Sequence, residues 1–116
     1  MDVYHIWAGL KPGTRDMDFA EAVHGYLGHL KGEGRIAGYR LTRRKLGLGH
    51  PNLPEWHITI DFEGLAQMDE AFGAVSSRTD PIEGLHHAVN AKVEGVFFAL
   101  YRDFPDGGRK TGEERF

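Results

Sequence analysis

Four short segments of this chain alternate apolar and polar residues with the two-residue period of a β-strand. In the first segment one alternate set is apolar and the other mixes His5 and Trp7 with smaller residues. Successive side chains of a strand point to opposite faces of a sheet, so each segment has one apolar face and one mixed polar face. The predicted strands are Val3 to Leu10, Ile36 to Lys45, Glu55 to Phe62 and Val96 to Arg102.

Helical patterns fill the two long gaps between these strands. From Asp16 to Glu33 the apolar residues recur at the spacing of one helix face, including Phe19, Val23 and Leu27. A second helical stretch carries Leu65, Met68, Phe72 and Val75 and is interrupted at Ser76 and Ser77. The sequence Asp80-Pro81 is typical of a new helix start, so the second helical segment is expected to be split.

The resulting order of elements predicts an α+β, ferredoxin-like βαββαβ fold. Its sheet would be antiparallel with four strands in the order 4-1-3-2, and its helices would cover one face. The apolar strand residues, such as Ile58, Phe98 and Leu100, are expected to pack on those helices. We expect a single domain over residues 1–104 and a charged, glycine-containing tail over residues 105–116.

Composition excludes several classes of function. The net charge of −3 argues against a nucleic-acid partner, which usually requires a basic surface. The sequence contains no cysteine, so disulfides and thiolate chemistry are excluded. No apolar run approaches the roughly 20 residues that span a bilayer. We therefore expect a cytoplasmic protein with no membrane partner.

The first strand Tyr4-His5-Ile6-Trp7, the long amphipathic helix, the basic second strand and the split second helix together resemble the dimeric α/β-barrel superfamily. The resemblance extends from Asp2 to Phe104 and is closest to an uncharacterised domain-of-unknown-function branch. It implies a homodimer in which two sheets face each other through their polar faces and close into a barrel. Relatives include quinone-forming monooxygenases without cofactors and stress-induced proteins. Their functional residues find no matching motif here.

The polar face of the predicted sheet is the candidate site. Strand order and an estimated register place His5 beside Asp61 and near Ala99 or Tyr101. They also place Trp7 beside Thr59, and His57 beside Gly9. In the predicted hairpin, Arg40 lies opposite Thr59, and Thr42 lies opposite His57. The expected lining is His5, Trp7, Arg40, Thr42, His57, Thr59, Asp61, Phe97 and Tyr101.

Residue chemistry suggests a role for each group. A carboxylate at Asp61 would orient the imidazole of His5 and make it a better general base. Arg40 would hold an anionic or enolate oxygen, and Tyr101 would donate a proton. The ligand-binding set would be Trp7, Thr42, His57, Thr59 and Phe97, whose aromatic members offer flat surfaces to a ligand. The histidines lack the spacing of known metal motifs, so we expect no metal and no cofactor.

Two functions follow from this pattern. The first is binding of an aromatic or polyketide-like small molecule, or a cofactor-independent monooxygenase or isomerase reaction on it. Its pocket would lie inside the barrel or between sheet and helices. The alternative is a non-catalytic homodimeric interaction or stress-related module, in which the polar residues only hydrogen-bond one another and water. An RNA-recognition domain is disfavoured, because Trp56 of the third strand falls on the helix face.

Overall fold

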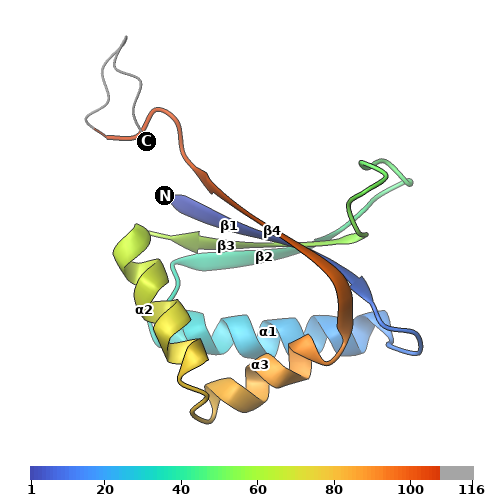
Figure 1. The fold of residues 1–116 in the computed structure, drawn as a ribbon, viewed down its shortest axis with the longest axis horizontal. Helices are drawn as coiled ribbons and strands as arrows, with labels where there is room; N and C mark the ends of the chain where they lie inside the picture. The colour runs from blue at the N-terminus through green and yellow to red at the C-terminus, as the bar shows by residue number, and fades with distance from the viewer. Residues whose placement is uncertain (108–116) are drawn as a thin grey trace.

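The computed structural model describes residues 1–107, so residues 108–116 of the predicted tail lie outside the described part. Its architecture is the predicted α+β, ferredoxin-like fold with a split second helical segment (Figure 1). The elements are β1 (Asp2–Leu10), α1 (Asp16–Gly32), β2 (Gly38–Arg43), β3 (Trp56–Phe62), α2 (Leu65–Ser76), α3 (Ile82–Asn90) and β4 (Val93–Arg102).

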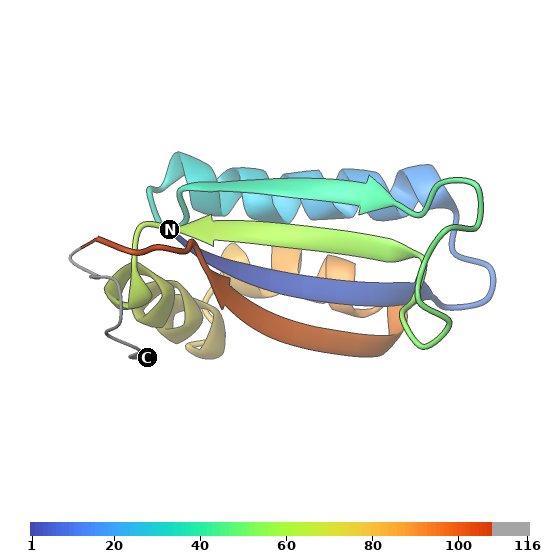
Figure 2. The same ribbon diagram turned by 90° about the horizontal axis from the view of Figure 1, so that it is seen from above.

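The four strands form one antiparallel sheet in the order β2-β3-β1-β4. This is the predicted order 4-1-3-2 read from the other edge, and Figure 2 shows the four strands side by side. The helices lie on one side of the sheet, and within residues 1–107 no helix covers the other side (Figure 1). We call the uncovered side the open face; it carries the side chains of His5 and Trp7.

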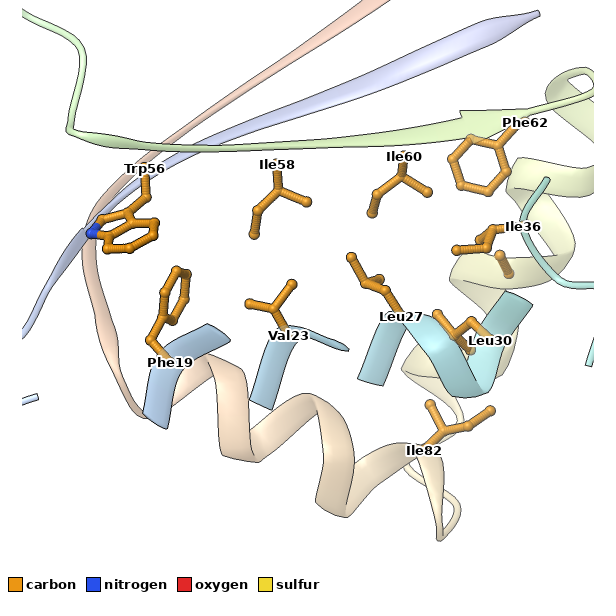
Figure 3. Close-up of a cluster of buried hydrophobic side chains, with 11 residues drawn as sticks. Phe19, Val23, Leu27, Leu30, Ile36, Trp56, Ile58, Ile60, Phe62 and Ile82 are labelled. Carbon is orange, nitrogen blue, oxygen red and sulfur yellow. The ribbon is translucent and has the colours of Figure 1, made fainter. Parts of the chain in front are cut away.

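The core forms where α1 packs on β3. Phe19, Val23, Leu27 and Leu30 occur on one side of α1 and are all buried. On β3, every second residue is buried, which reproduces the predicted alternation. Figure 3 shows the two rows of side chains facing each other. At one end of the row the rings of Phe19 and Trp56 meet edge to face at 5.2 Å. Each such side chain contributes about 1.5–3 kcal/mol by leaving water.

Strand β4 begins at Val93, three residues before the predicted start at Val96. The first residues of the strand precede a β-bulge, which breaks the alternating pattern. Trp7 pairs with Phe97, yet Gly9 pairs with Glu94, so β4 has one residue more than β1 over this interval. Gly95 lies inside the bulge with a φ of 62°, a conformation that glycine adopts without steric cost. The extra residue interrupts the alternation, and for this reason the sequence pattern indicated a start at Val96.

Edge strand β4 is only partly covered by the helices. Phe98 and Leu100 pair with Ile6 and Tyr4, so they share the helix-facing side as predicted. The expectation that they pack on the helices is wrong, since Phe98 remains 63% exposed and Leu100 50% exposed. Phe98 instead stacks on the neighbouring ring of Tyr4 at 5.8 Å. The helices pack mainly below the central strands and leave this edge open.

Candidate functional site

The predicted site residues share the open face of the sheet. The register of the β2–β3 hairpin is confirmed, because Arg40 pairs with Thr59 and Thr42 pairs with His57. On the other side of β1, His5 pairs with Ala99, as expected. All nine predicted residues occupy strand positions that face the same side of the sheet. They are His5, Trp7, Arg40, Thr42, His57, Thr59, Asp61, Phe97 and Tyr101.

The predicted pairing of His5 with Asp61 is wrong. In the β1–β3 ladder, His5 lies opposite Thr59, and Asp61 lies opposite Val3. The other expected pairs of β1 with β3 are wrong by the same two residues. Trp7, for example, lies opposite His57 rather than Thr59. A shift of two residues leaves every side chain on its original face, so the apolar pattern cannot exclude it. The proposed pair of general base and carboxylate therefore does not form.

A cluster of four aromatic rings occupies the centre of the open face. The rings of Trp7 and His57 stack at 4.6 Å with planes only 3° apart. His5 stacks on the same two rings and meets Tyr101 edge-on at 4.9 Å. The Nδ1 atom of His5 lies 2.9 Å from Nε2 of His57, so one imidazole donates a hydrogen bond to the other. We call these four residues the aromatic cluster.

The electrostatics of the open face favour the neutral form of His57. Partial burial lowers the pKa of His57 below its usual value, and the charge of a protonated His5 would lower it further. Thr42 donates its hydroxyl to the carbonyl of His57 at 3.3 Å and so is engaged with the backbone. Arg40 is exposed. Within residues 1–107, no carboxylate forms a hydrogen bond with His5 or His57.

A cavity of about 810 Å³ lies on the other side of the sheet, between it and the helices. Its floor is formed by β1, β3 and β4, with Ile6, Ile58 and Phe98 among the lining side chains. The three helices supply the rest of the wall, including Val23, Tyr26, Val75 and Val89. None of the nine predicted site residues lines this space. We call it the helix-side cavity.

A few polar groups stand among the apolar walls of the helix-side cavity. Burial raises the pKa of Tyr4, and burial together with Tyr4 raises the pKa of Tyr26 to about 12. Both phenols therefore keep their protons at neutral pH and can donate hydrogen bonds. The ring of Tyr26 lies 5.4 Å from that of His86, which also lines the cavity. This places an imidazole near phenolic donors in an apolar space.

A pocket between the sheet and the helices was one of the two expected locations, but sequence reasoning named none of its lining residues, because most of them are core-type residues. Tyr4 and Ile6 belong to the apolar alternation of β1, and Tyr26 belongs to the apolar stripe of α1. The signal that could have identified the site is the presence of polar-tipped residues, Tyr4, Tyr26 and His86, at positions that face the core. Such residues bring hydrogen-bonding groups into an apolar space.

Neither a metal cluster nor a membrane span occurs in residues 1–107. No three histidine or carboxylate side chains of this range gather closely enough to hold a metal ion. Over the same range no helix has the length and apolar character needed to cross a bilayer.

Comparison with solved structures places the fold among ferredoxin-like proteins. The Arabidopsis thaliana protein At3g17210 superposes with a TM-score of 0.72 at 11% identity, over 91% of this chain and 98% of that chain. SnoaB, a cofactor-independent oxygenase from Streptomyces nogalater, gives 0.65 at 7% identity, over 93% and 98%. A dimeric ferredoxin-like protein of unknown function from Jannaschia sp. CCS1 gives 0.60 at 14% identity, over 89% and 100%. At these identities the likeness shows the fold alone.

Similarity in sequence defines the family. A comparison with curated proteins finds no match to the chain. A match that extends over residues 1–116, the whole sequence, is to a family of unknown function. The chain therefore belongs to that family, DUF6614.

Proposed function

We propose that this protein binds a small aromatic or polyketide-like molecule in the helix-side cavity. The observation that carries the proposal is the cavity itself, whose volume of about 810 Å³ falls within the range of ligand pockets. Its walls combine aliphatic residues with the rings of Tyr4, Tyr26 and Phe98. Such walls suit a flat apolar ligand, and the few polar groups among them would fix its orientation.

The side chains in the cavity support a reaction that begins with removal of a proton. His86 would accept a proton from a bound phenol or from a carbon beside a carbonyl. The neutral phenols of Tyr26 and Tyr4 would donate hydrogen bonds to the enolate oxygen that forms. Return of the proton to another carbon completes an isomerisation and needs no cofactor. The same first step would serve a cofactor-independent monooxygenase that uses dioxygen, and the fold is similar to that of SnoaB, an oxygenase of this class.

The proposal includes a homodimer formed through the open faces of two sheets. The aromatic cluster and the exposed ring of Phe97 lie on a face that no helix covers. A second copy would remove these rings from water. The Jannaschia protein of similar fold is described as dimeric. The open-face residues would then act at a subunit contact, with the ligand held on the opposite side of each sheet.

Fluorescence of the neutral dye N-phenylnaphthylamine tests the cavity, because the dye becomes bright in an apolar site. We expect saturable binding to the wild type and much weaker binding to Val89→Trp and Val75→Trp, which add bulk to the cavity wall. Ala66→Trp is the matched control on the exposed side of α2, outside the lining. Unchanged binding in both cavity variants, or no binding to the wild type, would overturn the proposal. The non-catalytic homodimeric interaction module would then remain.

A further inference from the structure

Arg78 has an unusual backbone conformation for a residue with a side chain. Its φ is 55°, in the left-handed region that glycine normally occupies. It follows the C-terminal end of α2, where its backbone N–H donates to the carbonyl of Val75 at 3.3 Å. Glycine is the usual residue at this position of a helix end. An arginine here accepts backbone strain, and strained residues concentrate at functional sites.

Arg78 belongs to the lining of the helix-side cavity. It is exposed and forms no ion pair with any carboxylate within residues 1–107. The lining also contains the carboxylate residue Glu83, which forms no ion pair with Arg78. A guanidinium presents a planar set of donors that matches a carboxylate in two parallel hydrogen bonds. Arg78 is therefore an available anion-binding group beside an apolar space.

We propose that the ligand of the helix-side cavity is an aromatic or polyketide-like acid whose carboxylate binds Arg78. The inference rests on the proposed function and adds the charge and orientation of the ligand. The apolar body of the acid lies among the rings of Tyr4 and Tyr26, and its anionic end faces the turn between α2 and α3. The positive charge of Arg78 makes this residue specificity-determining, because it favours acids over neutral molecules of the same shape.

Two fluorescent probes with the same ring system separate charge from shape. N-phenylnaphthylamine is neutral, and anilinonaphthalene sulfonate carries one sulfonate on the same body. We expect the wild type to bind the anionic probe more tightly than the neutral one. Arg78→Gln should weaken binding of the anionic probe about ten-fold, which is the usual scale for loss of one charged hydrogen-bond partner. The same variant should bind the neutral probe as the wild type does, which also shows that it is folded.

Lys45→Gln removes one positive charge from an exposed loop position outside the cavity and controls for overall charge. If Lys45→Gln weakened binding of the anionic probe as much as Arg78→Gln does, the inference would be overturned, since Arg78 would then act only through net charge. Binding of the neutral probe without preference for the anion, or a preference that survives Arg78→Gln, would also overturn it while the proposed function stands. Failure of both probes to bind the wild type would overturn the proposed function and this inference with it.

Discussion

His5 and His57, on neighbouring strands, share one hydrogen bond, with Nδ1 of the first 2.9 Å from Nε2 of the second. The bond holds a single proton, so one ring is the donor and the other the acceptor. Protonation of both rings would place two positive charges side by side and remove the acceptor. The hydrogen bond therefore requires at least one neutral imidazole. The ring of Trp7 stacks on that of His57 at 4.6 Å.

The lowered pKa of His57 makes the stability of the fold depend on pH. Burial lowers the pKa of His57 in the folded protein below the ordinary value of 6.5, which the unfolded chain retains. As the pH falls through 6.5, the unfolded state takes up a proton before the folded state does, so the free energy of unfolding decreases. The loss continues until the pH passes below the folded pKa. Urea unfolding between about pH 7.5 and about pH 5.5 measures this slope.

A substitution at His57 identifies the source of the slope. His57→Gln keeps a polar side chain but does not titrate, so we expect a smaller loss of stability over the same pH range. His50→Gln is the matched control, because His50 is exposed in the loop between β2 and β3. A slope that stays the same in His57→Gln, or that decreases equally in His50→Gln, would contradict this assignment.

The fold could be predicted because periodicity determines which face each residue occupies. The apolar alternation of β3 and the helical stripe of α1 specify the two layers of the core. The register of β1 on β3 was not accessible, since a displacement of two residues changes neighbours without changing faces. The contact of His5 with His57 depends on that register. The bulge at Gly95 was hidden for a related reason, because one extra residue interrupts the alternation that marks a strand.

The candidate site was harder to predict than the fold. Polar residues such as Arg40 and Asp61 are conspicuous on a strand, and they drew attention to the open face. The helix-side cavity is lined by residues such as Ile58 and Val89, which have the same periodicity whether they fill a core or surround a space. Only side-chain packing in three dimensions distinguishes these two cases. The strained backbone of Arg78 likewise has no signature in a single sequence.

Charged substitutions on the open face should separate the proposed dimer. Tyr101 is 62% exposed and Phe97 is 48% exposed in the single chain, so a glutamate at either position costs the protomer little. In a dimer closed through this face, Tyr101→Glu or Phe97→Glu would bury a charge, and we expect the dimer Kd to rise about 100-fold. Sedimentation equilibrium measures this change. Met17→Glu, at an exposed position of α1 away from the open face, is the control. A wild type that sediments as a monomer, or two variants that remain dimeric, would exclude this interface.

The pairing of Asp2 with Arg102 should stabilise the contact between β1 and β4. Asp2 is 3% exposed, and its carboxylate accepts hydrogen bonds from Nε of Arg102 at 2.5 Å and from Nη2 at 3.2 Å. The hydrogen bond from Arg102 lowers the pKa of Asp2, although burial opposes this. The stabilisation is therefore present above the ordinary carboxyl pKa of 3.8 and is lost as the pH falls through the lower folded value.

Removal of the arginine leaves a buried carboxylate without its partner. We expect Arg102→Met to lower the Tm by several degrees at neutral pH, as measured by circular dichroism. Addition of Asp2→Asn to this variant removes the buried charge and should restore part of the loss. Equal melting temperatures for the wild type and Arg102→Met would show that the ion pair contributes nothing. A double variant less stable than Arg102→Met would contradict the argument from an unpaired charge.

Within the described part of the chain two non-glycine residues have a positive φ, and their replacement should separate strain from function. Leu46 and Arg78 have φ values of 56° and 55°, and Leu46 is 82% exposed. Glycine adopts this conformation without steric cost, so Leu46→Gly should raise the free energy of unfolding by about 1 kcal/mol. Arg78→Gly should also be stabilising, but by less, because it removes a positive charge from the end of α2. Urea unfolding with an unchanged m-value measures both effects.

Only one of these two glycine variants should affect binding. We expect Leu46→Gly to bind the anionic probe as the wild type does, whereas Arg78→Gly should lose the preference for it. A more stable protein that binds its ligand less well would mean that the strain at Arg78 is retained for recognition. If Arg78→Gly is instead less stable than the wild type while Leu46→Gly is more stable, the arginine side chain serves mainly to support the turn between α2 and α3.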